Sequence, residues 1–243
     1  MLEKIYLSVI IPAYNEEKRL PQTLAEINNY LQKQNFNYEI VVVSDGSTDK
    51  TVEIVQKLIP KIKNLKVLDY KKNQGKGFGV REGMLKAQGQ YRIFTDADNS
   101  TPIGQIEKIW LHLKEGFEIV IGSRDIKGAV LDPPQSSLRR LVGESFKYLR
   151  KIIVGLWEIE DSQCGFKCFT KKAAEDVFPR CKINRFAFDP EMLVIAKKLG
   201  YKIKEIPIYW KNDPASKVKF KSMFKMGLDL LRIRQNLITK KYD

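Results

Sequence analysis

The sequence is poor in histidine and cysteine, which argues against several kinds of catalytic and metal site. It has one histidine among 243 residues, so mechanisms that need a choice of histidines, such as a Ser-His-Asp triad, are not expected. The three cysteines, Cys164, Cys168 and Cys181, show no paired Cys-x-x-Cys spacing. Together with the lone His112 they argue against a zinc site and indicate reduced thiols. We expect His112 to pack at or near the surface of an amphipathic helix.

Long hydrophobic runs are also missing. The longest apolar stretches, such as 40–43, have only the length of a strand, whereas a membrane-spanning helix needs about 18 apolar residues. The chain enters a strand pattern at Ile5, without the basic, apolar and small-residue segments of a signal peptide. These two features favour a cytoplasmic protein.

Acidic residues are outnumbered by basic ones. There are 29 Asp and Glu residues against 43 Lys and Arg, which gives a net charge of +14. Such a balance suits anionic partners, namely nucleic acid, phosphorylated substrates or an anionic membrane surface. Composition alone does not choose among the three.

Strand and helix patterns alternate through the first 122 residues. Stretches rich in β-branched and apolar residues indicate strands, and the segments between them carry apolar residues at helical spacing. The expected strands are 6–12, 38–43, 65–70, 91–95 and 117–122, and the expected helices are 20–31, 49–58, 79–87 and 102–113. This alternation predicts an α/β fold with a mostly parallel central sheet flanked by helices.

The rest of the chain follows a different pattern. A polar segment, Lys127 to Ser137, contains two adjacent prolines and is expected to be a mobile loop. Beyond it we expect a basic helix over 138–154, an acidic turn and strand over 161–169, helices near Ala173 and Asp189, a strand over 203–209, and a C-terminal helix from about Val218. We expect a single domain with a nucleotide-binding half (1–122), an acceptor half (123–217) and a basic amphipathic helix (218–243).

Two carboxylates, Asp96 and Asp98, directly follow the expected strand 91–95. Ligands bind at the carboxyl ends of strands in α/β sheets, and alternate residues there usually point the same way. Both side chains can therefore face one hard cation. The alternative is that both are solvated turn acids before the next helix, for which Ser100-Thr101-Pro102 supplies a start signal.

Polar residues follow two other expected strands. Residues 12–16 read Pro-Ala-Tyr-Asn-Glu and lack the glycines of a dinucleotide-binding turn. Tyr14 can stack on a base and Glu16 can accept hydrogen bonds from sugar hydroxyls, or the acid can simply belong to a helix N-terminus. Asp45 ends the second strand, and helix capping, which accounts for the polar residues at 47–49, does not account for it.

A glycine-rich stretch covers residues 73–81 and lacks the spacing of a Walker A motif. Its glycines let the backbone approach a ligand, and Lys76 and Arg81 can offset phosphate charge. Alone, the stretch is a weak indication of a phosphate site.

Eight short motifs occur in order from Ser8 to about Lys217 and cover nearly the whole chain. They read SVIIPAYNE, VVVSDGSTDKT, NQGKGFGVREGM, FTDADNSTP, VIGSR, DSQCGFKCF, FDPEML and SK. In this order they resemble the family 2 glycosyltransferases, which have the GT-A fold. Among these, the chain is most similar to the dolichyl-phosphate β-glucosyltransferases, and it is closer to dolichyl-phosphate mannose synthases than to cellulose or chitin synthases.

The resemblance implies a donor site and a metal site. The positions that would hold the nucleotide sugar are Pro12, Tyr14, Glu16, Asp45, Lys76, Asp96, Ala97 and Lys217. Asp96 and Asp98 would bind Mg²⁺ or Mn²⁺ on the diphosphate. Ser100 stands where mannose synthases often carry a glutamine ligand, which leaves the third ligand open. The implied activity is an inverting, metal-dependent transfer from a nucleotide sugar, expected to be UDP-glucose, to a polyprenyl or dolichyl phosphate.

Catalytic roles are implied for Asp161 and Arg124. Asp161 matches an acidic motif that acts as a general base when the acceptor is a hydroxyl. A phosphate monoester has a second pKa of about 6 and is already a nucleophile, so with such an acceptor Asp161 need only position groups. The candidates to bind the acceptor phosphate are Arg124, Arg139, Arg140 and Lys167. Lys167 can alternatively bind the donor diphosphate. For Arg139 and Arg140 the alternative is a solvated helix face.

Two further acids and the C-terminal segment are less decisive. Asp189 and Glu191 match a family pattern and either contact the sugar or cap a helix. Residues 220–238 mix apolar and basic side chains, as in a helix that lies on an anionic membrane or packs against the domain. Because a polyprenyl acceptor requires a membrane, we expect a protein bound peripherally to a cytoplasmic membrane face.

Three alternatives remain at this point. The enzyme can instead be a GDP-mannose-dependent dolichyl-phosphate mannose synthase, or a glycosyltransferase whose acceptor is a hydroxyl, with Asp161 as its base. A basic nucleic-acid-binding protein would show steeply salt-dependent affinity and no role for Asp96 or Asp98. The acids at successive strand ends argue against this last class, so no nucleic-acid partner is expected.

Overall fold

The structure is a computed structural model that describes residues 4–134, 137–211 and 220–243. Within these residues the centre of the fold is a seven-stranded sheet in the order β3-β2-β1-β4-β7-β5-β8. The strands are β1 (Leu7–Ala13), β2 (Tyr38–Asp45), β3 (Leu65–Tyr70), β4 (Tyr91–Phe94), β5 (Ile119–Ser123), β7 (Lys167–Thr170) and β8 (Ile203–Pro207). β7 runs antiparallel to β4 and β5, and the other neighbours are parallel. The predicted mostly parallel central sheet is confirmed.

The central strands are apolar on both sides because helices cover both faces of the sheet. Every residue of β2 is buried, and successive side chains of β1 go to opposite faces. Ile10 joins the apolar core on one face, whereas Val9 and Ile11 join the core on the other. The fold is therefore built from two apolar cores separated by one sheet.

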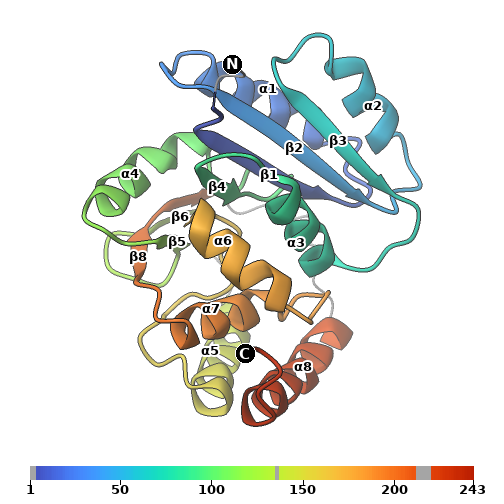
Figure 1. Cartoon of the computed structure of the whole chain (residues 1–243). Coiled ribbons are helices and arrows are strands. Elements are labelled where there is room, and N and C mark those ends of the chain that lie inside the picture. Colours follow the sequence, from blue (N-terminus) through green and yellow to red (C-terminus); the bar gives the residue numbers. More distant parts are fainter. Residues whose placement is uncertain (1–3, 135–136, 212–219) are drawn as a thin grey trace.

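Different helices fill the two cores. The first face is covered by α1 (Leu20–Leu31), α2 (Thr51–Leu58) and α4 (Ile106–Lys114). The second face is covered by α3 (Lys76–Lys86), α6 (Lys171–Val177) and α7 (Phe188–Lys198). In Figure 1, α3 and α6 lie in front of the sheet, while α1 lies behind β2. The expected flanking of the sheet by helices is thus observed.

Two longer helices extend the second layer. α5 (Ser137–Val154) and α8 (Phe220–Ile238) lie below the sheet in Figure 1, next to α7. Val154 of α5 and Leu230 and Ile233 of α8 belong to the same core as α7. The helix expected from about Val218 corresponds to α8, although Val218 itself lies outside the described residues.

Several element boundaries differ from the sequence predictions. The helix expected from residue 79 begins at Lys76, and the one expected from residue 49 begins at Thr51, because the Asp49 carboxylate accepts the Thr51 N–H at 2.9 Å. α4 begins at Ile106, after a 3₁₀ turn over Ile103–Gln105, so Pro102 is not in the first turn of that helix.

The segment 127–137 was predicted to be a loop, but part of it forms a strand. It contains β6 (Val130–Asp132), which pairs in parallel with β9 (Tyr209–Lys211), and residues 135–136 lie outside the described part. β9 in turn shows that the expected strand 203–209 is interrupted after Pro207. Pairing between segments so distant in sequence leaves no local pattern, which is why the loop prediction was wrong here.

Candidate functional site

A cleft of about 470 Å³ lies at the edge of the sheet where β1, β2, β4 and β5 end. Because these strands run in the same direction, the residues that follow them converge at this edge. Its lining includes nine residues that the sequence singled out: Pro12, Tyr14, Glu16, Asp45, Lys76, Asp96, Ala97, Asp98 and Arg124. Their convergence makes this cleft the candidate active site, and their contacts with a ligand stay predictions.

Asp45, at the end of β2, organises the glycine-rich segment. Its carboxylate accepts hydrogen bonds from Gln74 N at 2.9 Å, Gly75 N at 2.6 Å and Asn73 Nδ2 at 3.0 Å. Gly75 has a φ of +118°, and a Cβ there would lie 2.5 Å from the Asn184 carbonyl oxygen, so only glycine fits. Asp45 thus fixes the backbone that leads from β3 into α3 at one wall of the cleft.

Tyr14 and Glu16 lie beyond the end of β1 and also line the cleft. Tyr14 is 43 % exposed, which leaves its ring accessible for stacking on a flat ligand. Glu16 is joined to Arg19 by a short ion pair, with Arg19 Nη2 2.6 Å from Glu16 Oε1. The alternative for Glu16, a role at a helix N-terminus, also has support, since its carbonyl oxygen accepts the Leu20 N–H at 3.0 Å.

Asp96 and Asp98 follow β4 and face a positively charged partner. Lys76 Nζ, from the first turn of α3, lies 2.6 Å from Asp96 Oδ1. Burial and the neighbouring Asp96 charge raise the pKa of the Asp98 carboxyl. Gly165 packs directly against Asp96, where a Cβ would lie 2.2 Å from Asp96 Oδ2. The two carboxylates are therefore held close together in a partly dehydrated site that favours positive charge.

The residues present fit a divalent cation. Carboxylate oxygens are the donors that Mg²⁺ and Mn²⁺ prefer, and a cation beside both would relieve the repulsion that raises the pKa of Asp98. Ser100 supports the pair through its backbone, because its N–H donates to Asp98 Oδ1 at 2.9 Å. Across the described ranges no group of three or more His, Cys, Asp or Glu residues comes together, so further ligands would be diphosphate and water oxygens.

Asp161 is fully engaged by neighbouring N–H groups and does not line the cleft. Its carboxylate accepts five hydrogen bonds, from Arg124 N at 3.0 Å, Arg124 Nε at 2.7 Å, Arg124 Nη2 at 2.9 Å, Gln163 N at 2.9 Å and Cys164 N at 3.1 Å. Burial raises the pKa of this carboxyl, but the charge and hydrogen bonds of Arg124, together with the Lys167 charge, outweigh burial and hold the pKa well below its usual range. Asp161 thus fixes Arg124 rather than offering a basic oxygen to a substrate.

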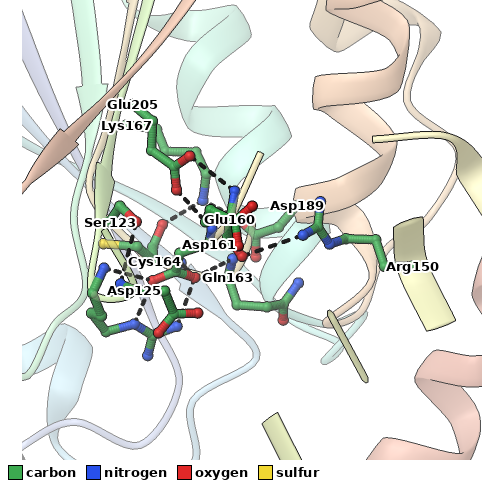
Figure 2. A network of polar contacts seen from close by, with 11 residues as sticks. Ser123, Asp125, Arg150, Glu160, Asp161, Gln163, Cys164, Lys167, Asp189 and Glu205 are labelled. Atoms are coloured by element: carbon green, nitrogen blue, oxygen red, sulfur yellow. Dashed lines mark hydrogen bonds and ion pairs between the residues drawn. The ribbon is translucent and has the colours of Figure 1, made fainter. Parts of the chain in front are cut away.

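The backbone at Asp161 is itself clamped between two charged side chains, as Figure 2 shows. Glu205 of β8 accepts the N–H groups of Glu160 and Asp161 at 2.9 and 2.7 Å. Arg150 of α5 is buried and donates to the carbonyl oxygens of Leu156 at 3.1 Å and Ile159 at 2.6 Å. These contacts determine where Asp161, and through it Arg124, can lie.

Lys167 is not where the prediction of a phosphate-binding residue requires it. Its side chain is 0 % exposed, and its Nζ lies 2.6 Å from Asp189 Oδ1 and donates to the Cys164 carbonyl oxygen. Because β7 lies between β4 and β5, its side chains are covered by both layers of helices. In this structure Lys167 compensates the buried charge of Asp189 and does not reach the cleft.

The structure separates the roles of Asp189 and Glu191. Asp189 lines the cleft, and burial raises the pKa of its carboxyl against the opposing effect of Lys167. Glu191 is buried away from the cleft, where it accepts the Lys182 and Ile183 N–H groups at 2.9 and 2.8 Å and the Tyr242 hydroxyl at 2.7 Å. Asp189 is therefore the one placed to meet a ligand, and Glu191 ties the C-terminus to the chain before α7.

Some predicted residues cannot be placed, and some cleft residues were not predicted. Lys217 and the side chains of Arg139 and Arg140 lie outside the described part of the structure. The cleft residues that sequence reasoning missed are Arg19, Asn73, Gln163, Arg185, Phe186 and Trp210. Trp210 lies in β9, and the others come from loops and turns whose direction no periodicity reveals, although Asn73 and Gln163 lie inside motifs that had been noted.

Comparison with known proteins agrees with this geometry. The Glycosyl transferase family 2 profile matches residues 8–178. A dolichyl-phosphate beta-glucosyltransferase of Trichomonas vaginalis is 39 % identical over 95 % of this chain and 73 % of its own length. The human dolichyl-phosphate beta-glucosyltransferase is 36 % identical over 96 % of this chain and 76 % of its own length.

Solved structures show the same fold at low sequence identity. The mannosyl-3-phosphoglycerate synthase of Rubrobacter xylanophilus has a TM-score of 0.70 at 14 % identity and covers 98 % of this chain and 75 % of its own. The glucosyl-3-phosphoglycerate synthase of Mycobacterium tuberculosis, solved with Mn²⁺, UDP and product, has a TM-score of 0.66 at 18 % identity, over 94 % of this chain and 78 % of its own. The chain is a GT-A-fold glycosyltransferase that belongs to family 2.

Proposed function

We propose that the protein transfers glucose from UDP-glucose to dolichyl phosphate, with inversion at the sugar and with Mg²⁺ or Mn²⁺ bound at Asp96 and Asp98. The names of the relatives support glucose as the sugar and dolichyl phosphate as the acceptor, the UDP in a solved structure of the same fold supports the nucleotide, and the two carboxylates support the metal. The observation that carries the proposal is the state of Asp161. An acid that accepts five hydrogen bonds and has a lowered pKa is a poor general base, which suits an acceptor that needs none.

A lipid phosphate needs no base because its second pKa is about 6. At neutral pH its oxygen attacks the anomeric carbon directly, the bond from that carbon to the diphosphate breaks, and the nucleoside diphosphate leaves with the bonding electrons. Attack opposite the leaving group inverts the sugar, so an α-linked donor gives a β-linked product without a covalent enzyme intermediate. A hydroxyl acceptor, in contrast, would need the proton acceptor that Asp161 does not provide.

The protein's own residues position the two phosphates. Arg124 donates hydrogen bonds from Nε and Nη2 to Asp161, and its guanidinium lies 5.4 Å from the centre of the Trp210 ring. These contacts fix the plane of the guanidinium at the wall of the cleft. A fixed guanidinium suits a phosphate, and we assign the acceptor phosphate to Arg124. Lys76, beside Asp96, would stabilise the departing diphosphate. A divalent cation, when bound, would neutralise charge on the same leaving group.

We further propose that the protein acts as a peripheral protein on the cytoplasmic face of an anionic membrane. α8 supports this, because its outward side is apolar: Phe224 is 73 % exposed, and Leu228 and Leu231 are more than half exposed. Of the 14 large apolar side chains exposed in the described residues, eight lie on α5, on α8 or directly after α5. They are Tyr148, Leu149, Ile152, Trp157, Phe224, Leu228, Leu231 and Ile238.

The flanks of this apolar surface are basic. On α8 the exposed side chains of Lys225 and Arg232 lie to one side of the apolar stripe and that of Arg234 lies to the other. Such a helix binds anionic lipid by burying its apolar side and pairing its cations with headgroups. Within the described residues, none of the helices is both long and apolar enough to span a bilayer.

A transfer assay with matched donors tests the proposal. Labelled UDP-glucose and GDP-mannose are each incubated with dolichyl phosphate in detergent, with Mn²⁺ or with EDTA. We expect lipid-linked glucose with Mn²⁺, its loss with EDTA, and its loss in Asp98→Ala. Transfer of mannose but not glucose would contradict the donor assignment, and full activity in EDTA would contradict the metal assignment. Absence of any lipid-linked product with either donor would contradict the proposed reaction.

A further inference from the structure

Among the described residues, four cationic side chains line the cleft, and Arg185 differs from the other three. Three of them are paired with carboxylates of the protein: Arg19 with Glu16 at 2.6 Å, Lys76 with Asp96 at 2.6 Å, and Arg124 with Asp161 at 2.7 Å. Over the same described residues, no carboxylate oxygen comes within 4.0 Å of the Arg185 guanidinium. A longer-range interaction of this kind links Arg185 to Asp229 of α8, where the Arg185 charge works against the burial that raises the pKa of the Asp229 carboxyl. Without a close ion pair, the Arg185 guanidinium keeps its N–H groups for a ligand.

The backbone that carries Arg185 is rigidly held. On one side, the Asn184 carbonyl oxygen accepts the Phe78 N–H at 3.1 Å, and the Ile183 N–H donates to Glu191 at 2.8 Å. On the other side, the Arg185 carbonyl oxygen accepts the Phe188 N–H at 3.2 Å at the start of α7. Because the backbone is already fixed, Arg185 loses only side-chain freedom when it binds a ligand.

Two glycines of the stretch 73–81 lie where a side chain would collide with the segment 183–188. A Cβ at Gly75 would lie 2.8 Å from Arg185 Cγ, and a Cβ at Gly77 would lie 2.7 Å from the Ile183 carbonyl oxygen. The stem of Arg185 therefore crosses the N-terminal end of α3, where the helix dipole also favours an anion. Gly75 and Gly77 of the glycine-rich motif, a weak phosphate signal by itself, thus have a structural reason in the close approach of the segment 183–188, which includes Arg185.

We propose that Arg185 binds a phosphate group of a ligand in the cleft. This inference rests on the proposed function, whose two ligands supply phosphate from two sources, the donor diphosphate and the acceptor lipid phosphate. The guanidinium fork matches phosphate oxygens in either case. The acids of the same cleft, among them Asp96 and Asp189, repel an anionic ligand, and the Arg185 charge reduces that repulsion.

The test compares Arg185→Gln with Lys182→Gln. Lys182 is an exposed cation of the same segment that does not line the cleft, so its replacement removes the same charge without affecting the site. Affinities for uridine, UMP and UDP are measured by calorimetry with Mn²⁺ present, and the KM for dolichyl phosphate is measured with saturating UDP-glucose. Unchanged melting temperatures of both variants without ligand confirm that they are folded.

If Arg185 binds the donor diphosphate, Arg185→Gln weakens UDP about tenfold or more and leaves uridine unchanged. If it binds the acceptor, UDP affinity is unchanged and the KM for dolichyl phosphate rises about tenfold. Equal weakening of uridine and UDP, or values for both ligands within about twofold of the Lys182→Gln control, would overturn the inference. Failure of the unmodified protein to bind UDP or to form product would instead overturn the proposed function, and the assignment of Arg185 with it.

Discussion

Replacing Asp161 by asparagine distinguishes a residue that positions Arg124 from a general base. The change keeps the shape of the side chain but removes its charge. Of the five N–H groups that now point at two carboxylate oxygens, only some can be accepted by the single amide oxygen, and the others face the amide N–H₂. Arg124 is left at the wall of the cleft, 19 % exposed, as a cation without its partner.

The magnitude follows from the burial of this pair. Losing one partner of a fully buried ion pair costs about 3–5 kcal/mol. Arg124 is 19 % exposed at the cleft and stays partly solvated, so the cost here is nearer to that of a buried group left without its hydrogen bonds, about 1–3 kcal/mol. In a chain of this size each kcal/mol lowers the melting temperature by about 2–4 °C, so we expect a fall on the order of 2–12 °C for Asp161→Asn. The double variant with Arg124→Gln should be more stable than the sum of the two single effects predicts, because no unpaired charge remains.

The pH dependence has a definite sign. Arg124 holds the pKa of Asp161 below the ordinary value of about 3.9, so the stabilising contribution of the pair is complete above that value and is lost as the pH falls through the folded pKa. Thermal unfolding of the four proteins at pH 7 and below about pH 4, where the difference between the original protein and Asp161→Asn should shrink, tests the reasoning together with kcat measured between pH 5 and 8. A variant Asp161→Asn with the melting temperature of the original protein and no turnover would refute it, because only a catalytic base gives that result.

Three further predictions concern burial, the C-terminus and the membrane surface. Burial raises the pKa of the Cys164 thiol to about 12 and also raises the pKa values of the Cys168 and Cys181 thiols. A thiol reagent at pH 8 should therefore modify no cysteine in the native protein and all three in denaturant. Rapid modification of the native protein would contradict the burial of these thiols. Tyr242→Phe removes a hydrogen bond to the buried Glu191 and should lower the free energy of unfolding in urea by about 1.5–3 kcal/mol, and an unchanged value would contradict this contact. Leu231→Glu should reduce co-sedimentation of the protein with anionic vesicles about tenfold. The control Leu111→Glu, at a similarly exposed site on α4, should leave co-sedimentation unchanged. Equal effects of the two substitutions would exclude α8 as the membrane-binding surface.

The sequence could predict the features of the fold and of the site that depend on local residue patterns. Alternation of strand and helix segments sufficed for the parallel part of the sheet, since helices on both faces require apolar strands. The same pattern located the residues at strand ends, so Asp45, Asp96, Asp98 and Arg124 could be grouped in one cleft before their positions were known. Because parallel strands end at the same edge of a sheet, residues that follow them in sequence lie close together in space.

The features that sequence missed depend on contacts between distant segments. Lys167 was assigned to a phosphate because no local signal shows that β7 enters the sheet between β4 and β5, where its side chain is buried against Asp189. Glu191 and Tyr242 are 51 residues apart, and only the folded chain joins them. Arg185 could not be chosen among 43 basic residues, because it differs from the other cleft cations in having no carboxylate within ion-pair distance among the described residues, which is a property of the folded chain.

The nature of the acceptor is the central claim, and one comparison tests it most directly. The protein is given UDP-glucose and Mn²⁺ with either dolichyl phosphate or dolichol, the same lipid ending in a hydroxyl. Because Asp161 is held as the partner of Arg124 and is a poor base, we predict glucose transfer to dolichyl phosphate and none to dolichol above background. Transfer to dolichol at a comparable rate would show that the site activates a hydroxyl, and would contradict the account of Asp161 on which the proposed reaction depends.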